Sequence, residues 1–134
     1  MGYAAEMLKT YPQPLVIDAA VLATAIEAMS DCVEACTADV DHNLGEPSVA
    51  EMVKCIRLCL DCTDVCAAAL AIVSRQGGFD TNVAKPLLQS CVAACRSCGD
   101  ECERHAGMHA HCRVCGEACR RCEDACVQVL ALLR

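Results

Sequence analysis

The chain has 134 residues, of which 15 are Cys, and its formal net charge is -7. This length is typical of one domain, and the acidic balance leaves few Lys and Arg side chains for a phosphate-binding surface, so nucleic acid is not an expected partner. Much of the 55% hydrophobic fraction is Ala and Cys. The fraction therefore overstates how many residues could form an ordinary core of Leu, Ile, Val and Phe.

We expect an N-terminal extension over residues 1–14 and a single domain over residues 15–134. The first long helix is predicted from about residue 15 to residue 41, a stretch that is rich in Ala. It should end before Asn43 and Gly45, because Asn and Gly tolerate the backbone conformation that closes a helix.

The second helix is predicted to start at Pro47 or Ser48 and to stop at Gly77 and Gly78. Ser48 and Glu51 have the spacing of a capping box, in which the two side chains bond to backbone N–H groups of the first turn.

A third helix is expected from Asp80 or Thr81 to about His105, with Pro86 in its first turns, and a fourth from about residue 109 to residue 133. Four helices joined by short loops predict an all-α fold, an antiparallel up-down-up-down four-helix bundle. No strand pattern competes with this prediction.

Cysteines recur every three or four residues within each of these helices. They are Cys32, Cys36, Cys55, Cys59, Cys62, Cys66, Cys91, Cys95, Cys98, Cys102, Cys112, Cys115, Cys119, Cys122 and Cys126. An alternation of three and four averages 3.5 residues, which keeps one narrow row of side chains facing inward. The bundle is therefore predicted to have a cysteine-lined core. One buried Cys is an ordinary small apolar residue, but a whole row packs less well than Leu would, so a binding function is favoured.

Several thiol and metal chemistries do not suit this pattern. A redox Cys-x-x-Cys needs a low-pKa thiol at the start of a helix beside a strand, whereas these motifs lie inside helices. No such motif is followed by His, so haem attachment is not expected. The sequence has neither the Glu-x-x-His of carboxylate di-iron proteins nor the cysteine run of bacterial ferredoxins.

Soft metal binding remains, because adjacent inward thiolates on a helix can hold one ion between them. If every thiolate bridges two Cu(I) ions, about 15 Cu⁺ balance 15 thiolates, and the buried core is neutral. Zn²⁺ with four thiolates per ion would leave excess negative charge in the core. Multiple Cu(I) ions are therefore the favoured cargo.

The antiparallel order places the loops 41–47 and 106–108 at the same end of the bundle, which we call the histidine end. All four histidines belong to it, namely His42, His105, His109 and His111, and so do Met52 and Met108. His105 and His109 continue the cysteine spacing, whereas a loop residue such as His42 is more often solvated. The opposite, apolar end collects Leu22, Val73, Leu87, Leu88, Val129 and Leu133.

The compartment follows from the same cysteines. A short secreted protein with this many would be a disulfide scaffold, but the N-terminal segment MGYAAEMLKTYPQP lacks the features of a secretory signal. The odd count leaves a thiol unpaired, and no apolar run approaches the ~18 residues of a membrane span. We expect a cytoplasmic protein with no membrane partner.

The CxxxCxxCxxxC strings of the second and third helices, the CxxCxxxCxxCxxxC string of the fourth and the His-x-His at His109 and His111 resemble the bacterial copper storage proteins of the cytosolic type. This resemblance implies a homotetramer of four-helix bundles filled with Cu(I). Carried over by position, it implies that all 15 cysteines are ligands, with Met52, His105, His109 and His111 at the histidine end.

The resulting hypothesis is a cytoplasmic, non-enzymatic store of many Cu(I) ions. Two alternatives stay open at this point. A copper chaperone would bind one or two ions at the histidine end and pass them to a partner. A zinc-buffering or detoxification protein would bind one ion per four thiols.

Overall fold

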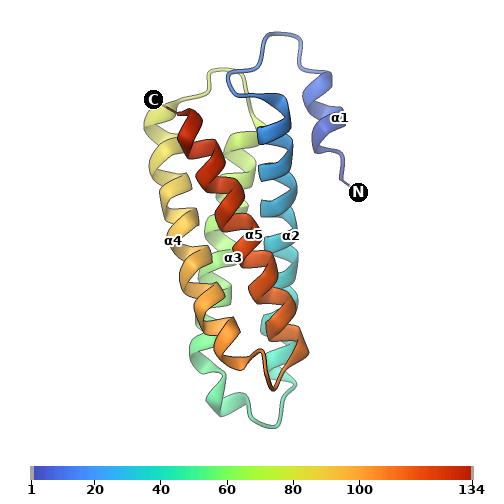
Figure 1. The fold of residues 1–134 in the computed structure, drawn as a ribbon, viewed down its shortest axis with the longest axis vertical. Helices are drawn as coiled ribbons and strands as arrows, with labels where there is room; N and C mark the ends of the chain where they lie inside the picture. Colours follow the sequence, from blue (N-terminus) through green and yellow to red (C-terminus); the bar gives the residue numbers. More distant parts are fainter. Residues whose placement is uncertain (1, 134) are drawn as a thin grey trace.

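A computed structural model describes residues 2–133 of the chain. In this range the chain forms five α-helices and one 3-10 helix, without a strand. Four long helices are antiparallel neighbours and make the bundle (Figure 1). They are α2 (Ala19–Leu44), α3 (Val53–Ser74), α4 (Thr81–His105) and α5 (Ala110–Leu132). The predicted all-α four-helix bundle is confirmed. No helix in the described range is both long and apolar enough to cross a membrane.

Helix α2 differs from its prediction at both ends. It begins at Ala19, where the Asp18 carboxylate accepts hydrogen bonds from the backbone N–H groups of Ala20 and Val21. At the other end it continues to Leu44, three residues beyond the prediction. The extra turn is stabilised by burial of Asn43, whose amide donates a hydrogen bond to Asp39.

The predicted capping box of the second helix is wrong. A 3-10 helix, η1 (Val49–Glu51), occupies that position, and α3 begins only at Val53. The Ser48 hydroxyl is buried without a hydrogen-bond partner, and the side chain of Glu51 is exposed. The local sequence signal was overridden because the tight 3-10 turn places Met52, rather than Ser48, at the start of the helix.

Helix α3 ends at Ser74, three residues before Gly77, whereas the limits of α4 and α5 agree with expectation. Asp80 caps α4 through a hydrogen bond from the Asn82 backbone N–H, and Pro86 lies inside the first turns of that helix. The α3–α4 turn contains Gly78 with a φ of 67°, a conformation that glycine adopts without strain.

The N-terminal segment contains a short helix, α1 (Ala4–Lys9), that the sequence pattern did not predict. It packs beside α2 (Figure 1) and buries Leu8. Ile17, just before α2, is buried as well. The division of the chain at residue 15 stays a prediction.

The apolar end of the bundle is closed by large side chains. Leu22, Val73, Leu88 and Val129 are fully buried, and Leu133 is nearly so. Leu87 is partly buried against this core. Because the thiols that line the rest of the axis are small, these residues supply much of the ordinary hydrophobic packing that stabilises the metal-free bundle.

We expect Leu88→Ala to lower the free energy of unfolding of the reduced, metal-free protein by about 2–5 kcal/mol, because the leucine is fully buried and its removal leaves a cavity. Chemical denaturation followed by circular dichroism measures this loss. Leu132→Ala is the matched control: Leu132 is 48% exposed near the same end, so its loss should stay within about 0.5 kcal/mol. Equal losses in both variants would contradict this account of the apolar end.

Candidate metal centre

Each long helix places one row of side chains on the axis of the bundle, separated alternately by three and four residues. In α2 the row runs through Leu22, Ala25, Met29, Cys32, Cys36, Asp39 and Asn43, all of which are buried. The corresponding rows of α3, α4 and α5 contain the other 13 cysteines. All 15 cysteines are at most 1% exposed and all are free thiols. The predicted cysteine-lined core is confirmed.

The thiols form a continuous network along the axis. Starting at the apolar end, successive Sγ atoms lie 3.4–3.9 Å apart along a path that crosses all four helices. The path runs through Cys126, Cys91, Cys66, Cys62, Cys32, Cys36, Cys115, Cys59, Cys98, Cys102 and Cys55. Cys95, Cys119 and Cys122 contact it from the side. An ion at any point of this path is therefore close to a further sulfur.

Groups of four ligand atoms recur along this network. In each group the atoms lie within 4.8 Å of one another, and one group takes one thiol from every long helix: Cys32, Cys66, Cys95 and Cys122. Because neighbouring groups share thiols, for example Cys32 and Cys36, the core is a chain of overlapping sites and not a set of separate ones. Overlap of this kind suits ions bridged by shared thiolates.

Burial acts to raise the pKa of the core thiols, which favours their neutral form. Burial is the main reason that the pKa of Cys112 lies above its ordinary value. The pKa of Cys126 is also raised, first by its contacts with Cys122 and Cys91 and then by burial. A protonated thiol behaves as a small apolar group, so the bundle can fold before any metal binds.

Three of the four histidines meet at the histidine end, as the antiparallel order predicted. The rings of His42 and His111 stack with centroids 5.4 Å apart, and those of His109 and His111 are 5.3 Å apart. His111 is half-buried, whereas His42 is exposed and bonds to the Ala38 carbonyl. The fourth, His105, is held through Nε2 by the Glu101 carboxylate at 3.0 Å.

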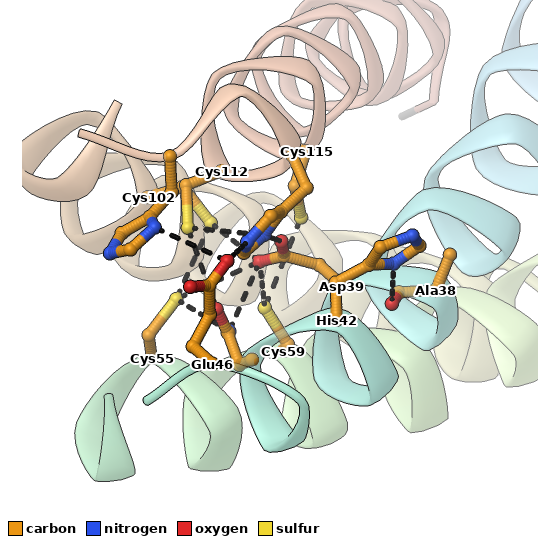
Figure 2. Close-up of polar contacts among 12 residues, drawn as sticks. Ala38, Asp39, His42, Glu46, Cys55, Cys59, Cys102, Cys112 and Cys115 are labelled. Carbon is orange, nitrogen blue, oxygen red and sulfur yellow. Dashed lines mark hydrogen bonds and ion pairs between the residues drawn. The ribbon is translucent and has the colours of Figure 1, made fainter. Parts of the chain in front are cut away.

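Asp39 joins the histidines to the thiols (Figure 2). Its Oδ1 lies 2.6 Å from His111 Nδ1, while its Oδ2 accepts contacts from the thiols of Cys59 at 3.5 Å, Cys55 at 3.7 Å and Cys102 at 3.8 Å. The residue is 1% exposed, and burial raises the pKa of its carboxyl group. Asp39 is therefore a buried acid at the boundary between the two ligand types.

Both ring nitrogens of His111 face carboxylates, since Nε2 lies 3.0 Å from Glu46 Oε1. Burial alone would lower the pKa of His111, but the hydrogen bonds to Asp39 and Glu46 outweigh burial and raise it. The contact with His111 lowers the pKa of Glu46 in turn. Cys112 is the third neighbour of His111. Its Sγ lies 3.6 Å from His111 Nδ1 and 3.6 Å from Asn43 Oδ1.

Met52 is buried in the core at the residue before α3, whereas Met108 is 86% exposed. Both belong to the histidine end, as expected from their positions in the chain.

Four polar residues of this end were not identified from the sequence as part of the site: Asp39, Asn43, Glu46 and Glu101. Asp39 and Asn43 continue the cysteine spacing of α2, since positions 32, 36, 39 and 43 are separated by four, three and four residues. That spacing could have identified both as buried. Glu101 precedes His105 by four residues on α4, a spacing that places the two side chains on one helix face and could have predicted their contact. For Glu46, which lies in the loop after α2, no sequence signal was available, because only the packing of α2 against α5 brings it to His111.

These features define a class: an all-helical bundle whose axis is a continuous thiol site for soft metal ions. Comparison with known proteins agrees. The copper storage protein family matches residues 18–131. A cysteine-rich protein of Bacillus subtilis (strain 168), YhjQ, is 34% identical over 106 residues, which cover 79% of this chain and 93% of that protein.

Solved structures give the same result. The copper storage protein Ccsp from Streptomyces lividans, loaded with 10 copper equivalents, has a TM-score of 0.93 at 51% identity, covering 96% of this chain and 98% of that one. A cytosolic copper storage protein from the same organism, with five coppers, has a TM-score of 0.82 at 54% identity, covering 84% of this chain and 93% of that one. The present chain belongs to the copper storage protein family.

The raised pKa of His111 predicts that the stability of the metal-free protein depends on pH. A group whose pKa is higher in the folded than in the unfolded protein stabilises the fold fully below its unfolded pKa, here about 6.5, and loses this contribution as the pH rises through its folded pKa. The free energy of unfolding of the metal-free protein should therefore fall between pH 6 and pH 8. Denaturant titrations at several pH values measure the slope.

The buried carboxyl of Asp39 acts in the same direction, because its raised pKa also penalises the ionised folded state. His111→Gln should flatten the slope, while His42→Gln, which removes an exposed ring without a carboxylate partner among the described contacts, should leave it in place. An unchanged slope in His111→Gln would show that other groups cause the pH dependence.

Proposed function

We propose that this chain stores many Cu(I) ions, which thiolates bind along the whole axis of the bundle. The observation that carries the proposal is the continuous path of sulfur atoms 3.4–3.9 Å apart from Cys126 at the apolar end to Cys55 at the histidine end. A protein that handed over one ion at a time would need only the outermost of these thiols. Thiolates are the ligands that Cu(I) prefers.

Charge supports copper over zinc as the cargo. Each Cu⁺ can replace one thiol proton, so a core with one ion per thiolate stays neutral, whereas four thiolates around one Zn²⁺ leave two negative charges in a buried site. Uncompensated buried charge costs several kcal/mol per ion even after relaxation. The overlapping ligand groups favour bridged Cu(I) for the same reason, because they share their thiols.

The proposed ligands are all 15 cysteines, with Met52, His105, His109 and His111 at the histidine end. Ions would enter there, since the opposite end is closed by Leu22, Leu88 and other large side chains. We further propose that the protein works in the cytosol, as its Streptomyces relative is described to do, and that it has no catalytic role. Storage requires only binding and release.

We expect the fully reduced protein to bind about 15 or more Cu(I) equivalents per chain. Titration without oxygen against a competing Cu(I) chelator measures this number. The double variant Cys91→Ala/Cys126→Ala should lower the capacity by about two ions, because both thiols lie in the sulfur path near the apolar end. Ser74→Ala, which changes an exposed residue of α3 outside the path, is the control.

A capacity of four ions or fewer would contradict storage and favour the chaperone or zinc hypothesis. A full capacity that the double variant leaves unchanged would contradict the assignment of ligands along the whole axis. Binding should also release about one proton per thiol, so the apparent affinity should rise with pH.

The family resemblance also supports a homotetramer. Exposed apolar side chains on the outer faces of the bundle, including Leu60, Val83, Val114 and Val127, offer surface that subunit contacts would bury. Sedimentation equilibrium should therefore give a mass of four times 14.2 kDa. A mass of one chain at all concentrations would contradict the tetramer.

A further inference from the structure

The ligand types at the histidine end differ from those of the core. Within the core nearly every ligand atom is sulfur, which suits Cu(I). At the histidine end, outside this core, imidazole nitrogens and a carboxylate oxygen lie close together. Glu46 Oε1 lies 3.5 Å from His109 Nδ1 and 3.0 Å from His111 Nε2. Nitrogen and oxygen ligands of this kind suit Cu(II) better than Cu(I).

This group of three residues, which we call the outer N/O site, can be reached from solvent. The side chains of His109, His111 and Glu46 are 13%, 18% and 28% exposed. His109 and His111 lie at the start of α5, and Glu46 lies in the segment after α2. The bundle brings these two parts of the chain together. A cupric ion from solution could therefore bind here before it meets a thiol.

Thiols, which can act as reductants, lie between the outer N/O site and the rest of the core. Cys112 Sγ is 3.6 Å from His111 Nδ1, and Asp39 links His111 to the thiols of Cys55 and Cys102. These two thiols belong to α3 and α4, and their Sγ atoms are 3.9 Å apart. They are the outermost cysteines of their helices, and their sulfur atoms already lie next to each other.

We propose that the outer N/O site captures Cu(II) and that the thiols of Cys55 and Cys102 reduce it, so that the protein can load Cu(I) from cupric ions. This inference rests on the proposed storage function. Two Cu(II) ions each accept one electron, the two thiols each lose one electron and one proton, and one S–S bond forms. The products are two Cu(I) ions, one disulfide and two protons, and the 13 remaining thiols accept the reduced ions.

The reaction is stoichiometric. Every pair of ions reduced removes two thiols, so cupric loading should end with a lower capacity than cuprous loading. The buried carboxylate of Asp39, which is in contact with Cys55 and Cys102, is positioned to accept one of the two protons that leave the thiols, and the other is released to solvent.

The test adds two equivalents of cupric sulfate to the fully reduced protein without oxygen. We expect the Cu(II) signal in electron paramagnetic resonance to disappear, two thiols per chain to be lost, and a Cys55–Cys102 disulfide to be found by peptide mapping of samples quenched early. Persistence of the Cu(II) signal, or reduction with no Cys55–Cys102 disulfide, would overturn the inference.

The Glu46→Gln variant tests whether the outer N/O site is needed, because it removes the carboxylate that contacts both His109 and His111. We expect its rate of Cu(II) reduction, divided by its rate of Cu(I) uptake from a cuprous donor, to fall about tenfold or more. Glu51→Gln, at an exposed glutamate of the same loop region that has no contact with the histidines among the described residues, is the matched control. An equal ratio in both variants would overturn the inference.

The Cu(I) uptake measured in the same series separates this inference from the storage proposal. Full Cu(I) capacity with no Cu(II) reduction overturns the inference alone. A Cu(I) capacity of four ions or fewer overturns storage, and with it the inference that depends on storage.

Discussion

Every helix of the bundle keeps one row of side chains on the axis, with alternating steps of three and four residues, and the rest of the structure depends on this spacing. A 3.5-residue average holds the row on the axis over the full helix length. Because thiols are small, four such rows can approach until sulfur atoms from different helices are in contact. Leu at the same positions would fill the axis and leave no ligand atoms. The same packing geometry thus makes both the core and the binding site.

The rows change chemistry along their length, and this change divides the molecule into three zones. Large aliphatic side chains such as Leu88 and Val129 close one end and contribute much of the ordinary hydrophobic stabilisation. Thiols occupy the middle, and a protonated thiol can exchange its proton for Cu⁺ without leaving net charge. Polar groups occupy the other end, where contact with water lowers the cost of charge. The axis thus changes from apolar side chains through soft thiols to polar groups, which supports the proposed entry of copper at the histidine end.

Asp39 holds the boundary between the thiols and the histidines. A carboxyl group that is 1% exposed is costly unless it is hydrogen-bonded, and here His111, Asn43 and three thiols surround it. Its contacts fix the orientation of the His111 ring, while Glu46 approaches that ring from the opposite side. The outcome is a polar cluster in which Asp39 and Glu46 raise the pKa of His111, and His111 lowers the pKa of Glu46.

The sequence by itself determined the bundle, the inward direction of all 15 cysteines and the shared end of the four histidines, because helix periodicity and short loops are local properties. It also contained the burial of Asp39 and Asn43, which continue the α2 spacing. Only the tertiary structure decided that Glu46 pairs with His111, that Ser48 does not cap α3, and that α1 packs on α2. Those outcomes depend on contacts between segments far apart in the chain, and the energies of such contacts exceed the local preferences that a sequence pattern records.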